Sequence, residues 1–174
     1  MIIRTVIFAS VLLSSTFAGA STTQHQQHGS IEGLQQVGSG EMNWFLLTVY
    51  QASLFSDDGD YKSNDWPMAL QITYHHDIKA EDLITATAEQ WQHLNYQQSL
   101  FNDWLGQLET LWPDVEAGDQ LTLRVEQDGS HNFYHNQVPI GYIEDERFAA
   151  AFLDIWLSED TSEEKLRAKL IGEY

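Results

Sequence analysis

The chain contains no cysteine among its 174 residues. Disulfide bonds, thiolate metal ligands and cysteine nucleophiles are therefore excluded, and stability has to come from a packed core. Basic residues are also scarce, because 8 Lys and Arg stand against 26 Asp and Glu and give a formal net charge of −18. Such acidity repels nucleic-acid phosphates and anionic lipid headgroups. It therefore argues against nucleic-acid binding and against peripheral attachment to membranes.

Long hydrophobic runs are absent as well. The first apolar run, residues 6–13, is too short to span a bilayer, and no later run reaches the necessary length. Arg4 before this run and the Ala-Gly-Ala sequence that ends at Ala20 complete the layout of a cleavable secretory signal over residues 1–20. We therefore expect cleavage after Ala20, a periplasmic or secreted protein, and no stable membrane insertion.

Recognisable catalytic and metal-binding motifs are missing too. The chain has no Gly-x-Ser-x-Gly elbow, no Ser-x-x-Lys pair and no phosphate-binding glycine loop. Neighbouring His75 and His76 point to opposite faces of a strand, and His131 and His135 would stand about 13 Å apart along one, too far for a single zinc ion. The acidic loop at residues 57–60 lacks the spacing of an EF-hand. We expect no metal and no cofactor.

What the chain does have is regular apolar patterning after a Gln-, His-, Ser- and Thr-rich segment at residues 21–30, which is predicted to be a flexible leader. Residues 31–174 are predicted to form one domain. Residues 34–54 favour a strand interrupted near Gly38-Ser-Gly, and residues 44–50, apolar on both faces, predict a place inside a covered sheet. Residues 68–74 favour the antiparallel return.

The rest of the domain alternates between helical and strand patterns. Apolar residues at helical spacing predict helices near residues 83–94 and 100–112, and three short strands follow, with turns at Asp128-Gly129 and Asn136-Gln137. Two closing helices are predicted, the second behind a capping box from Thr161 to Glu164. This order predicts an α+β domain in which helices cover an antiparallel sheet.

The same region resembles a known family. The residues that carry the resemblance are Gly141-Tyr-Ile-Glu-Asp145, Phe148, Phe152, Ile155-Trp-Leu157, and Trp112-Pro-Asp-Val115 upstream. They are similar to the bacterial secreted branch of the chalcone isomerase-like family, over roughly residues 33–172. The resemblance implies a curved antiparallel β-sheet with helices layered on one face, an open-faced sandwich with a ligand cleft between the layers. Enzymes of that family close a chalcone into a flavanone without a cofactor, and a related branch holds fatty acids.

Two departures from the family pattern concern the cleft. The resemblance implies an arginine at the position closest to Met42, and there is no Lys or Arg between Ser21 and Tyr61. Phe45 stands roughly where the enzymes carry a threonine. A neutral thioether cannot stabilise an oxyanion, so chalcone isomerase activity is not expected. Arg124 and Arg147 are the distant residues that would have to replace the missing cation.

The candidate ligand-binding residues follow from strand alternation, which projects even-numbered residues of the first apolar segment on one face. They are Met42, Trp44, Thr48 and Tyr50 from this segment, with Tyr74 from the next strand. If the opposite face meets the helices, Phe45, Leu47 and Val49 take their place. The favoured hypothesis is non-catalytic binding of a small apolar, fatty-acid-like ligand. A cofactor-independent isomerase or lyase that uses tyrosine and histidine is one alternative. An envelope interaction scaffold, with a filled cleft and an exposed apolar patch, is another.

Overall fold

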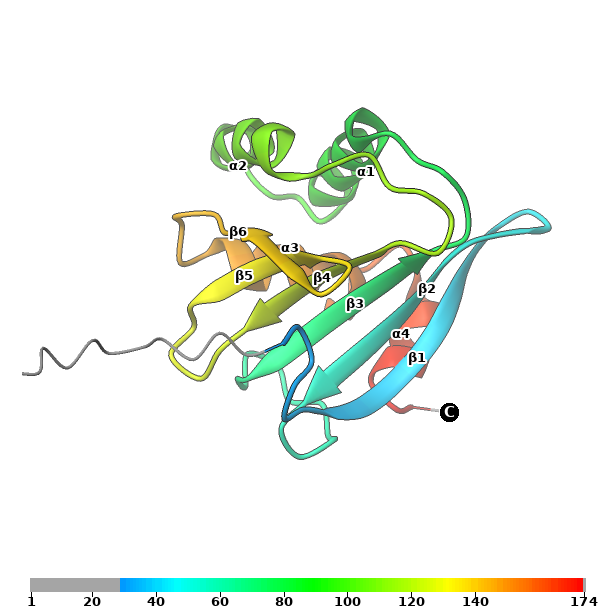
Figure 1. Cartoon of the computed structure of the whole chain (residues 1–174), viewed down its shortest axis with the longest axis vertical. Helices are drawn as coiled ribbons and strands as arrows, with labels where there is room; N and C mark the ends of the chain where they lie inside the picture. The colour runs from blue at the N-terminus through cyan, green and yellow to red at the C-terminus, as the bar shows by residue number, and fades with distance from the viewer. Residues whose placement is uncertain (1–28, 174) are drawn as a thin grey trace, which may run out of the picture.

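The computed structural model describes residues 29–173. The predicted signal over residues 1–20 and nearly all of the predicted leader over residues 21–30 lie outside the described residues, so both stay predictions. The described part forms one six-stranded antiparallel sheet with the strand order β1-β2-β3-β4-β5-β6. Each strand therefore pairs with its neighbour in sequence, and two helices are inserted between β3 and β4 (Figure 1).

The elements have the following bounds. The strands are β1 (Gln35–Trp44), β2 (Leu47–Ser56), β3 (Met68–Tyr74), β4 (Gln120–Val125), β5 (His131–His135) and β6 (Val138–Gly141). The helices are α1 (Ala80–His93), α2 (Gln98–Leu111), α3 (Phe148–Leu157) and α4 (Glu164–Leu170). In the described part no helix is long and apolar enough to cross a bilayer.

One row of cross-strand partners explains how the sheet receives the helices. The row runs through Gly38, Leu54, Leu70, Leu123, Phe133 and Gly141. Its four central side chains are all buried and face the helices. The two glycines stand on the edge strands, where helix residues approach closely. A Cβ on Gly141 would lie 2.6 Å from Cδ1 of Leu111, near the end of α2.

Aromatic side chains form much of the packing between the two layers. Trp91 of α1, Trp104 of α2 and Phe148 of α3 are almost wholly buried and meet edge to face. The indole Nε1 of Trp91 also donates a hydrogen bond of 2.8 Å to the backbone oxygen of Ala151, which ties α1 to α3. The α+β class and the antiparallel sheet with helices on one face are confirmed.

The first predicted strand is wrong in its details. Residues 34–54 form two strands, and the break falls at Phe45 and Leu46 rather than at the glycines. The apolar run at residues 44–50, expected inside a covered sheet, includes the exposed end of the β1–β2 hairpin. Gly38 and Gly40 continue β1 because they make room for α4, which packs directly on this strand.

The predicted capping box is also wrong. Helix α4 begins at Glu164 and has no side-chain hydrogen bond at its N-cap. The Thr161 hydroxyl donates instead to the backbone oxygen of Ile155 at 2.7 Å and accepts from the Glu163 amide at 3.2 Å. Thr161 therefore fastens the loop to the end of α3. The helix gains its orientation from Leu166 and Leu170, which are buried against the core.

Replacing Gly38 with alanine is expected to destabilise the fold by about 1–3 kcal/mol, because the new methyl group would overpack the contact between α4 and β1. That methyl group would clash with the backbone oxygen of Lys169 and lie 2.7 Å from that of Leu170. Urea denaturation measures the effect. Gly106 in α2 is the matched control, since nothing lies within 4 Å of a Cβ there and the Gly-to-Ala change favours the helix. Equal stability changes at the two positions would contradict the packing account.

Candidate functional site

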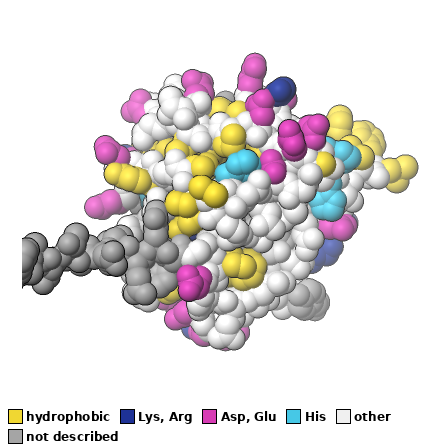
Figure 2. Space-filling model, in the orientation of Figure 1, with side chains coloured by type: hydrophobic (Ala, Val, Ile, Leu, Met, Phe, Trp, Pro, Cys, Tyr) yellow, Lys and Arg dark blue, Asp and Glu magenta, His cyan; other side chains and the backbone are white. Residues whose placement is uncertain are grey.

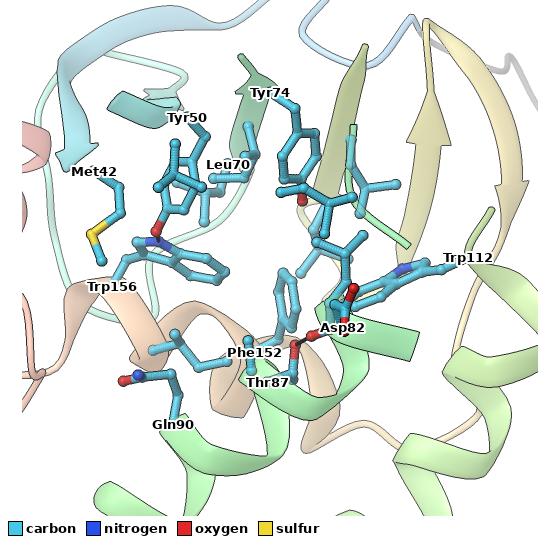
Figure 3. Close-up of a pocket in the computed structure, with 18 of the residues that line it drawn as sticks. Met42, Tyr50, Leu70, Tyr74, Asp82, Thr87, Gln90, Trp112, Phe152 and Trp156 are labelled. Carbon is cyan, nitrogen blue, oxygen red and sulfur yellow. Dashed lines mark hydrogen bonds between the residues drawn. The ribbon is translucent and has the colours of Figure 1, made fainter. Parts of the chain in front are cut away.

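A cavity of about 470 Å³ lies between the sheet and the helices. Strands β1 to β5 form one wall, and α1, α3 and Trp112, the residue that follows α2, form the other (Figure 3). Most of its lining is aliphatic or aromatic, including Leu70, Ile72 and Phe152. A cavity of this size and character suits a small, mainly apolar molecule.

The predicted ligand-binding residues divide into two groups. Met42, Trp44, Tyr50 and Tyr74 line the cavity, whereas Thr48 does not. Their role as ligand contacts stays a prediction.

The exception at Thr48 has a backbone cause. Met42 pairs with Tyr50, but the next residue of β1, Asn43, pairs with Thr48, so Val49 is the extra residue of a β-bulge. The bulge shifts the alternation by one residue, and Val49 lines the cavity in place of Thr48. The Thr48 hydroxyl donates to Oδ1 of Asn43 at 2.7 Å. A single bulge therefore removes Thr48 from the even-numbered residues predicted to line the cavity, whereas Met42, Trp44 and Tyr50 follow the predicted pattern.

Two tyrosines supply hydroxyl groups on the sheet side of the cavity. The rings of Tyr50 and Tyr74 meet edge to face with their centroids 6.2 Å apart, and the Tyr50 hydroxyl accepts a 2.9 Å hydrogen bond from Nε1 of Trp156. The Tyr74 hydroxyl points into the cavity (Figure 3) and has no hydrogen-bond partner within residues 29–173.

Both phenols stay protonated near neutral pH. Burial, chiefly, raises the pKa of Tyr50 to about 12, and burial also raises the pKa of Tyr74. Each hydroxyl can therefore donate a hydrogen bond to a ligand. Neither is prepared to act as a base, because a catalytic base needs a pKa near the working pH.

The charged groups at the cavity are all acidic. Asp82 and Glu89 on α1 are exposed, and Glu163 ahead of α4 is half-buried. Of the described residues that line the cavity, none is Lys, Arg or His. A ligand carboxylate would meet like charge and find no ion-pair partner.

The two distant arginines do not replace the missing cation. Arg124 follows the cavity-lining Leu123 on β4 and therefore lies on the opposite face of the sheet, where its Nε contacts Oε1 of Glu126 at 2.7 Å. Its Nη1 donates to the backbone oxygens of Gly29 and Glu32. Arg147 pairs with Asp145 at 2.7 Å, away from this cavity.

Histidines do not gather into a metal site in the described part of the chain, where no cluster of three or more His, Asp and Glu residues could hold an ion. His135 contacts Oδ2 of Asp119 at 3.1 Å, and His131 is buried against Phe148 with ring centroids 5.4 Å apart. Within residues 29–173, Nε2 of His131 has no hydrogen-bond partner.

This burial predicts a pH dependence of stability. Desolvation lowers the pKa of His131 from its ordinary 6.5, so the folded state binds the proton less readily than the unfolded state. The stability contributed by keeping His131 neutral is expected to be fully present above pH 6.5. Below that pH the free energy of unfolding should fall, by up to about 1.4 kcal/mol for each pH unit. Urea denaturation between neutral and mildly acidic pH measures this slope.

The matched variants separate His131 from the other histidines. His131→Phe is expected to flatten the slope in that range, because the unfolded state then has one proton fewer to gain. His75→Phe, at an exposed position, is expected to leave it unchanged. A slope that survives in His131→Phe would assign the effect to other groups.

Comparison with known proteins fits this geometry. The profile of the family described as chalcone isomerase-like matches residues 14–172. The chain belongs to the chalcone isomerase-like family. A Haemophilus influenzae protein described as uncharacterised is 27% identical over 138 residues, which cover 79% of this chain and 68% of that protein. The predicted resemblance to bacterial members of the family agrees with this bacterial relative.

A solved structure shares the fold at much lower identity. It is the crystal structure of an Arabidopsis thaliana fatty-acid binding protein, with a TM-score of 0.64 and 12% identity. The match covers 80% of this chain and 87% of that one. At this identity the likeness concerns the arrangement of sheet and helices.

Several cavity residues were not identified from the sequence. Trp112, Phe152 and Trp156 line the cavity, and their helical spacing predicted only a face turned toward the core. The same spacing serves both purposes, because the cavity is a gap within the core. None of the three carried a separate signal. The indole of the half-buried Trp156 donates to the Tyr50 hydroxyl, whereas Nε1 of the buried Trp112 has no hydrogen-bond partner within residues 29–173.

Proposed function

We propose that this chain is a secreted, non-catalytic binding protein that holds a small ligand with a long apolar part between its sheet and helices. The single observation that carries the proposal is the cavity of about 470 Å³, lined mainly by apolar side chains and bordered by two neutral phenols. Most of the affinity would come from burial of the apolar part. The fatty-acid binding neighbour with the same fold supports this choice.

The polar end of the ligand is proposed to be uncharged. A fatty-acid carboxylate would be repelled by Asp82, Glu89 and Glu163 and has no cation to pair with in the cavity wall. A hydroxyl, ester or amide group, in contrast, can accept a hydrogen bond from Tyr74 or Tyr50. An acyl-type chain with such a neutral end fits better than a free fatty-acid anion.

The first test is direct. The full chain is expressed in a bacterium, and the isolated protein is studied by native mass spectrometry and organic extraction. The expected result is a protein mass that matches cleavage after Ala20, together with one dissociable apolar molecule per chain. A ligand-free protein that neither hexadecanol nor palmitate stabilises against heat would overturn the binding function. A retained signal would overturn the proposal of secretion.

Removal of one oxygen atom from the cavity wall tests how the polar end of the ligand is held. Tyr74→Phe removes the unpaired hydroxyl and is expected to weaken hexadecanol binding by about 3- to 10-fold, the value of one ordinary hydrogen bond. Isothermal titration calorimetry gives the dissociation constants. Hexadecane binding should be unaffected, since it has no acceptor. Equal effects on both ligands would show that the ring is needed only for packing.

A further inference from the structure

The end of the β1–β2 hairpin is the most apolar exposed feature of the described chain. Trp44 is 66% exposed, Phe45 89%, Leu46 104% and Leu47 47%. These four consecutive residues are called the hairpin tip below. Figure 2 shows hydrophobic side chains protruding at one edge of the molecule, where Figure 1 places the turn between β1 and β2. The tip therefore projects as a narrow apolar knob.

Neither turn chemistry nor packing accounts for these residues. Trp44 pairs with Leu47, so Phe45 and Leu46 form a two-residue hairpin turn. Phe45 has a φ of 55°, a conformation that such turns normally assign to glycine or asparagine. A phenylalanine held there costs conformational energy and gains no burial in the isolated chain, which is the pattern of a functional position.

The tip is also free of charge. No Asp, Glu, Lys, Arg or His occurs from residue 42 to residue 56, in a chain that carries 26 acidic residues. The tip can therefore approach an uncharged apolar environment without desolvating a charge of its own. Trp44 and Leu47 close its backbone ladder, and Asn43 and Thr48 pair with each other behind them.

The tip is continuous with the cavity. Trp44 belongs to the tip and also lines the cavity. Met42 and Val49, which lie just outside the tip on β1 and β2, line the cavity too. A molecule that leaves the cavity past this part of the wall reaches the tip directly. The two features together indicate that the ligand enters and leaves beside the hairpin.

We propose that the hairpin tip docks reversibly on a lipid surface without net charge, such as a zwitterionic membrane, and that the ligand is exchanged there. A convex apolar knob with an aromatic residue at its base suits the soft interface between headgroups and acyl chains. The inference rests on the proposed binding of an apolar ligand. It also narrows the conclusion drawn from charge, since a net charge of −18 repels anionic membranes but not neutral ones.

Vesicle flotation tests the docking. The protein is mixed with phosphatidylcholine vesicles, or with vesicles that also contain phosphatidylglycerol, and the floated fraction is measured. We expect binding to phosphatidylcholine and weaker binding when phosphatidylglycerol is present. The variant F45G/L46N keeps a turn of the kind that suits the observed backbone and is expected to bind at least about tenfold less.

Tyr142→Ser is the matched control, because Tyr142 is also a large exposed hydrophobic residue but lies outside the tip. It should float like the unchanged protein. Equal losses in both variants would overturn the assignment to the tip. If F45G/L46N instead converts a dimer to a monomer in sedimentation, with flotation unaltered, the tip is a self-association surface and the proposal fails.

Hexadecanol uptake separates this inference from the binding function. If the protein binds dispersed hexadecanol but does not float, docking is overturned and the binding function stands. If it floats but binds no hexadecanol, the tip docks and the exchange of ligand is overturned. The unchanged protein is expected to bind in both assays. F45G/L46N should take up dispersed hexadecanol as the unchanged protein does, but should be slowed at least about tenfold in the transfer of hexadecanol from phosphatidylcholine vesicles.

Discussion

Replacing Ala86 with tryptophan is expected to reduce ligand affinity by at least about 100-fold, the equivalent of roughly 2.7 kcal/mol. Ala86 lies on α1 and lines the cavity, yet its own side chain is exposed. The larger ring can therefore occupy space that the ligand needs without forcing the sheet and helices apart. Calorimetric titration of the purified protein with hexadecanol measures the change.

Thr85→Trp is the matched control. Thr85 is the preceding residue on the same helix, is exposed and does not line the cavity. Both variants should keep the far-ultraviolet circular dichroism of the unchanged protein. If neither Ala86→Trp nor Thr85→Trp lowers the affinity, the ligand binds elsewhere. If both lower it to a similar extent, the loss reflects a general disturbance of α1.

Replacing Phe148 with alanine is expected to lower the free energy of unfolding by about 3–5 kcal/mol, because a wholly buried aromatic ring is deleted from a tightly packed cluster. Its ring lies 5.6 Å from that of Trp104 and 5.6 Å from that of Phe152, measured between centroids. The helices α2 and α3 meet at this point. Urea denaturation followed by tryptophan fluorescence gives the value.

Phe45→Ala provides the comparison, since it deletes the same side chain from a position that is 89% exposed. Its effect on the free energy of unfolding should stay within about 0.5 kcal/mol. A large loss of stability from Phe45→Ala would mean that the hairpin tip packs against the domain in solution. That result would also remove the basis for docking on a lipid surface.

The catalytic alternative finds little chemical support in this cavity. Met42 stands where the family resemblance implies an arginine, and Tyr50 and Tyr74 hold their protons because burial raises their pKa values. The catalytic alternative also required histidines, but no histidine of the described residues lines the cavity, and His131 and His135 lie elsewhere. Two neutral donors in an apolar cavity can orient a ligand, but the described lining holds no cation to stabilise the negative charge that develops on the substrate during ring closure.

The scaffold alternative was defined by a filled cleft and an exposed apolar patch. The structure has an open cavity and an exposed patch, so these two features are not exclusive. Their continuity through Trp44 makes a joint role in ligand binding and exchange the simpler explanation. The experiments with F45G/L46N and Ala86→Trp address the two features one at a time.

Local patterns in the sequence were sufficient for the fold class, whereas the division of the first strand pattern into β1 and β2 became evident only in the structure. The turns at Asp128-Gly129 and Asn136-Gln137 were predicted, and Gly129, Asn136 and Gln137 adopt a positive φ, which suits glycine and asparagine but is unusual for glutamine. Patterns failed where tertiary contacts override local preference. Gly38 lies inside a strand because α4 needs the room, and Phe45 occupies a tight turn although its residue type disfavours it.

The sequence by itself determined that this protein has no disulfide, an acidic surface, an antiparallel sheet under helices, and no arginine near Met42. These are properties of composition and of short-range periodicity. Only the tertiary structure decided that Tyr50, Tyr74 and Trp156 meet around an empty volume, that a bulge at Val49 turns Thr48 away, and that the apolar run of β1 and β2 ends in solvent. The reason is physical: a side chain that lines a cavity and one that fills a core obey the same periodicity, and only the packing of distant elements separates them.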